Sequence, residues 1–147
     1  MAPIQEWIAA DRPFLGICIG FQMLFESSTE SPGARGIAAF PGSVVRFPDS
    51  PGLKVPHMGW NEIKIVKDTP VLYNIPQDSW FYFVHSYYPA PEDNIISAVK
   101  TTYGFEFTSA VSESNIFASQ FHPEKSSTLG LKMVQNFSTL CGGSIGA

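Results

Sequence analysis

Residues 14–22 are Phe14-Leu15-Gly16-Ile17-Cys18-Ile19-Gly20-Phe21-Gln22. The unbroken apolar run over residues 14–17 predicts a short strand buried on both faces, as strands of parallel sheets are. Apolar residues at positions 21, 24 and 25 have helical spacing, so we expect a helix over residues 21–26, beginning directly after Cys18. This order of strand, cysteine and helix is typical of a nucleophile elbow, a tight turn that holds a reactive side chain at the edge of a sheet.

Cys18 has two interpretations. As a nucleophile it would gain from the unpaired N–H groups of the helix start, which favour the thiolate, and the N–H of Ile19 would point toward an oxyanion. The elbow residue would then be strained, and the flanking glycines would let backbone and substrate approach closely. Alternatively, Cys18 is a small buried apolar residue, since cysteine is among the most buried residue types.

His122 is the candidate base for this thiol, within Gln120-Phe121-His122-Pro123-Glu124 at the end of an apolar strand. In an extended stretch His122 and Glu124 project to the same side, so the carboxylate would hold the imidazole tautomer and stabilise the imidazolium. The alternative is an ordinary surface turn.

The remaining pattern predicts one mixed α/β domain over residues 1–147. We expect helices near the N-terminus and after residue 126, a surface loop over residues 27–35, and strands at residues 43–47, 61–66, 80–85, 95–100 and 116–121. Residues 56–61 are interpreted as a loop rich in Pro and Gly, whose Met and Trp either form a contact surface or cap the core. His85 ends an apolar strand, where a hydrogen-bonded core position is the simplest interpretation.

Composition excludes several classes of protein. A net charge of −4 with 44% apolar and 15% charged residues is that of a folded chain, without the basic surface that nucleic acids or membranes require. No apolar stretch approaches the ~20 residues of a spanning helix, and a signal peptide is not expected. Two cysteines, Cys18 and Cys141, are too few for a disulfide framework and favour a reducing cytoplasm. No metal-ligand cluster or phosphate-cradling glycine loop is present, so we expect no metal site and no cofactor.

Four segments together resemble the class I (triad) glutamine amidotransferases, and within them the glutaminase subunits of imidazole glycerol phosphate synthase from histidine biosynthesis. These segments are residues 13–22, 56–61 (Pro-His-Met-Gly-Trp-Asn), 83–87 (Phe-Val-His-Ser-Tyr) and 120–126 (Gln-Phe-His-Pro-Glu-Lys-Ser). The resemblance implies a flavodoxin-like mixed sheet flanked by helices.

The resemblance also implies roles for individual residues. Cys18 would attack the side-chain amide of glutamine, with His122 as proton carrier and Glu124 as its orienting acid. Gln22 and the backbone of Ser86 and Tyr87 would hold the substrate. The implied residues for contact with a (β/α)8-barrel cyclase subunit, which would receive the ammonia, are Met58, Trp60 and Asn61.

The chain departs from the family upstream of the elbow. Family members carry several βα units before the nucleophile strand, including a loop of the oxyanion hole, whereas thirteen residues precede Phe14 here. We therefore expect a partial, N-terminally truncated form of the fold, an exposed sheet edge that supports a homo-oligomer, and impaired glutaminase activity. Two alternatives stay open: a thiol hydrolase acting on small activated esters, and a non-catalytic binding module.

Overall fold

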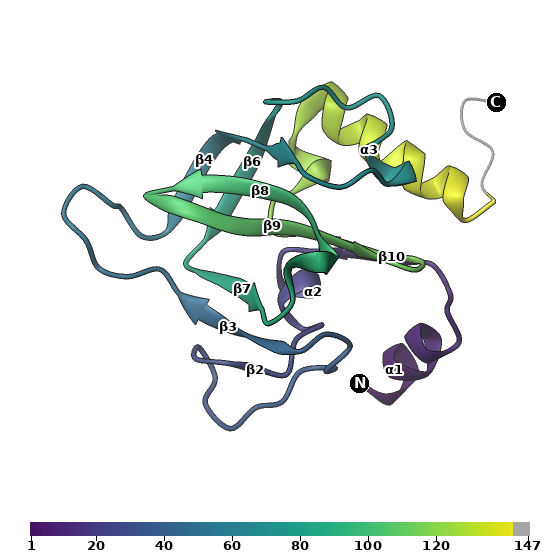
Figure 1. Ribbon diagram of the computed structural model, residues 1–147, viewed down its shortest axis with the longest axis horizontal. Helices are drawn as coiled ribbons and strands as arrows, with labels where there is room; N and C mark the ends of the chain where they lie inside the picture. Colours follow the sequence, from purple (N-terminus) through teal and green to yellow (C-terminus); the bar gives the residue numbers. More distant parts are fainter. Residues whose placement is uncertain (143–147) are drawn as a thin grey trace.

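A five-stranded sheet forms the centre of the computed structural model, which describes residues 1–142 (Figure 1). Its strand order is β1 (Phe14–Ile17), β10 (Ile116–Ser119), β9 (Phe105–Glu113), β8 (Ser97–Tyr103) and β5 (Lys64–Ile65). The β1–β10 pair is parallel, and the other neighbours are antiparallel. Because Ile17 lies opposite Ser119, the residues that follow β1 and β10 meet at one edge of the sheet.

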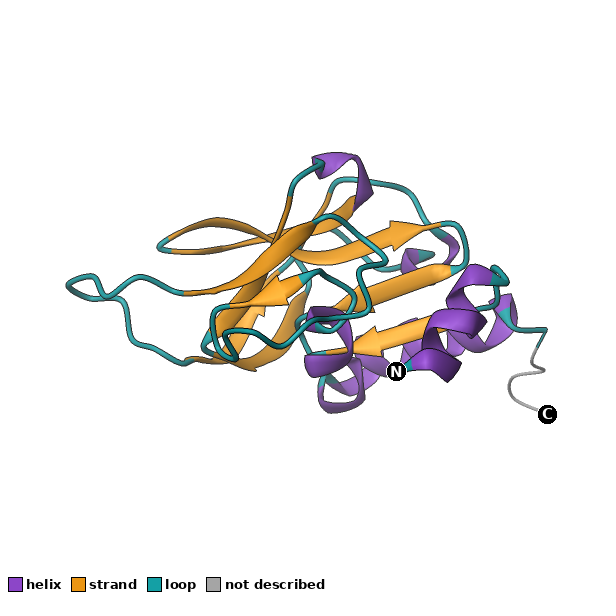
Figure 2. Ribbon diagram, turned by 90° about the horizontal axis from the view of Figure 1, so that it is seen from below, coloured by secondary structure: helices purple, strands orange, loops and turns teal. Residues whose placement is uncertain are grey.

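Two smaller sheets and the helices surround this centre. One small sheet has the order β2 (Ser27–Ser28), β3 (Gly42–Arg46) and β7 (Tyr87–Pro91), and the other pairs β4 (His57–Glu62) with β6 (Trp80–His85). The α-helices are α1 (Ala2–Ala9), α2 (Ile19–Gln22) and α3 (Ser127–Leu140), and the 3-10 turns are η1 (Pro70–Leu72), η2 (Asn94–Ile96) and η3 (Pro123–Lys125). Figure 2 shows most helical segments toward one end of the strand layers.

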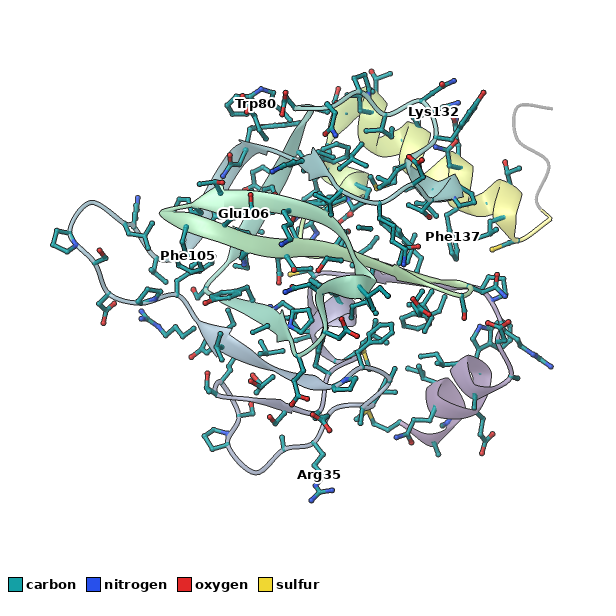
Figure 3. The ribbon with its side chains drawn as sticks, in the orientation of Figure 1. Arg35, Trp80, Phe105, Glu106, Lys132 and Phe137 are labelled. Carbon is teal, nitrogen blue, oxygen red and sulfur yellow. The ribbon has the colours of Figure 1, made fainter. Side chains whose placement is uncertain are left out.

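The central sheet separates two apolar clusters, because side chains alternate between its faces. On β10, Phe117 packs into the cluster formed with β6 and α3, whereas Ile116 and Ala118 pack into the cluster formed with α2 and β3. Figure 1 shows the same division, with α3 on one side of the β8–β9–β10 layer and α2 on the other. In Figure 3 Phe137 lies on the side of α3 that faces the sheet. The expected mixed α/β architecture is confirmed.

Several boundaries differ from the predicted ones. Residues 57–62 are strand β4, not a loop, because they pair residue by residue with β6 from His57–His85 to Glu62–Trp80. The predicted strand 61–66 is therefore divided between β4 and β5, and residues 94–96 form the turn η2 before β8 begins. Helix α2 is a single turn that ends at Gln22, although Leu24 and Phe25 beyond it are fully buried.

Strand β1 forms with the predicted bounds but is not buried on both faces. Only Gly16 of its four residues is buried, because β1 is the last strand of the sheet in this chain and pairs on one side with β10. Of the helices in the described part of the chain, none has the length and apolar character to cross a membrane.

Candidate active site

The turn at Cys18 has the geometry of a nucleophile elbow. Cys18 has φ 54° and ψ −104°, its N–H donates to the carbonyl of Ser119 at 2.8 Å, and α2 begins at the next residue. A Cβ at Gly16 would lie 2.6 Å from the carbonyl oxygen of Gly20, so only glycine allows β1 and α2 to come this close. A Cβ at Gly20 would meet no atom within 4 Å, so this side of the turn is open. The predicted strain at Cys18 is confirmed.

The surroundings of the Cys18 thiol favour its protonated form. Burial raises its pKa above the ordinary value, and the negative charge of Glu124 acts in the same direction. The N–H of Ile19, the side-chain amide of Gln120 and the charge of Lys125 lower the pKa but do not outweigh burial. Burial thus opposes the thiolate preference expected at a helix start, and the proposed nucleophile needs a base.

His122 has the form of such a base. Its Nδ1 lies 2.5 Å from Oε1 of Glu124, and because a carboxylate only accepts, Nδ1 carries a proton; in the neutral ring Nε2 then has the lone pair. Nε2 is buried and has no hydrogen-bond partner among residues 1–142. The segment is not extended as expected: His122 precedes the turn η3, which folds Glu124 back toward the ring.

Strand β6 holds His122 in place through its backbone. The N–H of His122 donates to the carbonyl of Tyr82 at 2.9 Å. The buried hydroxyl of Ser126 donates to the carbonyl of His122 at 2.5 Å and accepts from the N–H of Tyr82 at 3.0 Å. His122 follows β10 as Cys18 follows β1, so the two side chains start from the same edge of the sheet.

Gln120 is a site residue whose role was not predicted from the sequence. It is fully buried, its Nε2 lies 3.6 Å from Sγ of Cys18, and its Oε1 accepts from Nε2 of Gln22 at 3.2 Å. A signal was present, since a polar residue directly follows an apolar strand. Its meaning depended on the parallel register of β1 and β10, which places Gln120 opposite Cys18.

The model of the family described as glutamine amidotransferase class-I matches residues 1–140. This chain belongs to the class-I glutamine amidotransferases. The relatives include proteins named imidazole glycerol phosphate synthase subunit HisH. Those of Methanocaldococcus jannaschii, Aromatoleum aromaticum and Methanothermobacter thermautotrophicus are 50%, 55% and 52% identical over 93%, 91% and 86% of this chain. The aligned regions cover 70%, 66% and 62% of those relatives, so the chain spans about two thirds of their length.

Solved structures give the same fold. A putative GMP synthase protein from Thermoplasma acidophilum superposes with a TM-score of 0.68 at 20% identity, covering 96% of this chain and 63% of that one. A glutamine amidotransferase from Thermotoga maritima superposes with a TM-score of 0.63 at 19% identity, covering 96% and 53%. These likenesses confirm the predicted fold class of the amidotransferase chain.

The predicted substrate residues of this amidotransferase lie beside the elbow, but their carbonyls are occupied. The Tyr87 carbonyl accepts from Nε2 of Gln22 at 3.1 Å and from Nδ1 of His85 at 2.8 Å, and the Ser86 carbonyl accepts from the N–H of Phe47 at 3.0 Å. Gln22 is thus hydrogen-bonded to the segment of Ser86 and Tyr87, as expected of residues that would bind the substrate together. Ile19, whose N–H was the expected oxyanion donor, is 67% exposed.

His57 and His85 form a buried pair behind this segment. Nδ1 of His57 lies 2.9 Å from Nε2 of His85, and the ring of His57 stacks against Tyr103 and Phe83. Burial lowers the pKa of His57 to about 4 and that of His85 to about 3, so both are neutral at ordinary pH. The structure supports the interpretation of His85 as a hydrogen-bonded core residue.

The expected contact residues separate onto the two faces of β4. Met58 and Trp60 are 61% and 47% exposed on the outer face, next to Tyr82 of β6. Trp80, 52% exposed, lies at the periphery in Figure 3. Asn61 points the other way, donating to the carbonyl of Thr102 at 2.9 Å and lying 3.2 Å from Nε2 of His57. Within the described residues, no cluster of three or more His, Cys, Asp or Glu side chains is placed to hold a metal ion.

Proposed function

We propose that this chain hydrolyses glutamine to glutamate and ammonia as the glutaminase subunit of an imidazole glycerol phosphate synthase. The observation that carries the proposal is the elbow of Cys18 at the same edge of the sheet as His122, whose Nδ1 is hydrogen-bonded to Glu124. The 50–55% identity to relatives named subunit HisH supports the choice of synthase.

The proposed reaction begins at the thiol. Nε2 of His122 removes the proton from Sγ of Cys18, and the thiolate attacks the side-chain amide carbon of glutamine. The N–H of Ile19 donates to the oxyanion that forms. When the carbon–nitrogen bond breaks, His122 gives its proton to the nitrogen, so ammonia leaves and a glutamyl thioester remains. Water, deprotonated by His122, then attacks the thioester, releasing glutamate and the thiol, while Glu124 stabilises each imidazolium.

Substrate would lie on the open side of the elbow. Gly20 leaves space there, and Gln22 on the same helical turn is fixed by the carbonyl of Tyr87. With the Ser86 and Tyr87 carbonyls occupied, we infer that this segment shapes the site and that any direct contact with glutamine comes from its other atoms.

The partner in this proposal is a (β/α)8-barrel cyclase subunit that docks on the outer face of β4 and β6. Large, exposed apolar side chains such as Met58, Trp60 and Trp80 are typical of interface hot spots. Tyr82, beside Trp60, also binds the backbone of His122, so this face lies directly behind the proposed base. Asn61 faces inward and would act through His57 rather than by contact with the partner.

Two further expectations from the sequence stay proposals. Self-association through β1, the outermost strand of the sheet in the described part of the chain, predicts an oligomer, and a monomer in sedimentation at micromolar concentration would contradict it. A cytoplasmic location is supported by Cys18 and Cys141, both of which are free.

The deciding experiment is release of glutamate from glutamine by the chain with and without a barrel cyclase, in comparison with Cys18→Ala. We expect hydrolysis that the cyclase increases and Cys18→Ala abolishes; equal rates for both proteins would refute the proposal. Hydrolysis of a chromogenic ester by Cys18 without any hydrolysis of glutamine would instead favour the thiol hydrolase.

A further inference from the structure

A chain of hydrogen bonds runs from β4 to the sulfur of Cys18, and its first fixed point is Asn61. Nδ2 of Asn61 donates to the carbonyl of Thr102, and Oδ1 accepts from the N–H of Glu62 at 2.8 Å. Both ends of the amide are therefore assigned by backbone groups that cannot change roles. The same Nδ2 lies 3.2 Å from Nε2 of His57, which must accept and carries no proton.

The carbonyl of Tyr87 fixes the other end of the histidine pair. A carbonyl only accepts, so Nδ1 of His85 carries the proton and Nε2 of His85 accepts from Nδ1 of His57. The constraints at Asn61 and at Tyr87 give the same result, the Nδ1–H tautomer in both rings. A proton on either Nε2 would face another donor, so the chain requires two neutral histidines.

The same carbonyl orients the two glutamines. Nε2 of Gln22 donates to Tyr87, and it also donates to Oε1 of Gln120. The nitrogen of Gln120 is thereby turned toward Sγ of Cys18 at 3.6 Å. Turning the Gln120 amide over would oppose two nitrogens, and turning Gln22 over as well would oppose its oxygen to the carbonyl of Tyr87.

We propose that Gln120 is a positioning residue for Cys18, whose thiolate the amide nitrogen of Gln120 stabilises. The orientation of the Gln120 amide is fixed by the chain of hydrogen bonds described above, which runs through Asn61, His57, His85, Tyr87 and Gln22. The place of Gln120 in catalysis rests on the proposed glutaminase function. Its effect on the thiol does not, because it is measurable without substrate. The other groups that influence the thiolate are the N–H of Ile19, the carboxylate of Glu124 and the ammonium group of Lys125.

Alkylation of Cys18 by iodoacetamide as a function of pH tests the thiol. In a Cys141→Ser background Cys18 is the single cysteine. Gln120→Met removes the donor at similar volume, and we expect the alkylation midpoint to rise by about one pH unit. Gln120→Glu keeps the acceptor for Gln22 but presents a carboxylate to the sulfur, so the midpoint should rise further.

Gln77→Met is the matched control, because Gln77 also makes two hydrogen bonds, to the backbone of Ile65. We expect its midpoint to equal that of the parent. Circular dichroism establishes that each variant is folded, and Gln22→Met, which removes only the orienting donor, should give a smaller rise if Gln120→Met does not fold. An unchanged midpoint in the folded Gln120 or Gln22 variants, or an equal rise in Gln77→Met, overturns the proposal.

The histidine tautomers provide a second readout. With three histidines in the chain, ¹⁵N-labelled imidazole spectra can be assigned with a His122→Asn variant. We expect the Nδ1–H pattern for His57 and His85, and an Nε2–H pattern in either ring overturns the chain. Neither readout uses glutamine, so a thiol shift in a protein without glutaminase activity would support this inference while refuting the proposed function.

Discussion

His122 and Glu124 share a hydrogen bond of 2.5 Å between Nδ1 and Oε1, although the proline between them begins a 3-10 turn rather than an extended stretch. The turn presents the carboxylate to the ring at Nδ1, and Nε2 has no hydrogen-bond partner in the described part of the chain. In the proposed reaction this carboxylate stabilises the imidazolium, while its charge also raises the pKa of Cys18. Glu124 therefore stabilises the charged form of His122 in the proposed reaction but destabilises the charged form of Cys18.

Glu124→Gln separates these two effects. We expect kcat for glutamine to fall by about 10²–10⁴-fold, because the imidazolium loses its counter-charge and the tautomer is no longer fixed. The alkylation midpoint of Cys18 should fall at the same time, because a nearby negative charge is gone. Glu113→Gln is the control, since Glu113 pairs with Lys67 at 3.5 Å away from the elbow. A kcat within threefold of the parent would argue against the role of Glu124.

Gly16 and Gly20 form a matched pair for the close approach at the elbow. A Cβ at Gly16 would overlap the backbone of α2, so Gly16→Ala should lower the free energy of unfolding by roughly 1–3 kcal/mol. Gly20 lies in α2 with open space around it, so Gly20→Ala should leave stability unchanged or raise it by up to about 1 kcal/mol. Urea unfolding of both variants measures the difference. Equal effects would mean that β1 and α2 can separate at little cost.

The elbow could be predicted from the sequence because its causes are local. An apolar run, a cysteine between glycines and a following apolar helix turn are all contained in nine residues. The pairing of His122 with Glu124 is similarly local, since the two residues are two positions apart. Each of these features depends on neighbours along the chain.

Features that depend on register were missed. Strand β9 was not predicted because it is buried on both faces and each face carries a hydroxyl: Thr108 pairs with Ser97, and Ser109 with Thr101, which hides the apolar pattern. Strand β4 was interpreted as a loop because Pro56 and Gly59 are typical of turns, and its pairing with β6 outweighs that local preference. The role of Gln120 needs the β1–β10 register, which no local pattern encodes.

The buried histidine pair predicts a loss of stability in weak acid. The pKa values of His57 and His85, about 4 and about 3 when folded, lie below the ordinary value of 6.5 that applies to the unfolded chain. The unfolded chain thus binds more protons, so the stabilisation is complete above about pH 6.5 and is lost as pH falls from there toward 4. With two histidines, the slope of the unfolding free energy against pH approaches about 2.7 kcal/mol per pH unit.

Urea unfolding between pH 4.5 and 7.5 measures that slope. His85→Phe places an apolar ring among Phe47, Phe83 and Phe107 and removes one of the two titrating groups. We expect the slope to fall by about 1.4 kcal/mol per pH unit, which is half of the contribution of the pair, because the other acid-sensitive groups are common to both proteins. A slope identical to that of the parent would show that the pair does not titrate on unfolding.

The hydroxyl of Ser126 connects the proposed base to the strand behind it, and its removal should affect both stability and turnover. Ser126 is buried, and its Oγ bridges the N–H of Tyr82 and the carbonyl of His122. Ser126→Ala leaves both backbone groups without that partner, which should cost about 1–3 kcal/mol of unfolding free energy.

Ser79→Ala is the matched control, since Ser79 is also buried and its Oγ donates to the carbonyl of Pro76 at 2.5 Å, away from the elbow. We expect thermal unfolding to show a loss of stability in both variants, but kcat for glutamine to fall in Ser126→Ala alone, because only there does the imidazole lose its backbone support. Equal kcat values in the two variants would mean that one hydrogen bond is sufficient to position the ring, namely the one that the N–H of His122 donates to the carbonyl of Tyr82 at 2.9 Å.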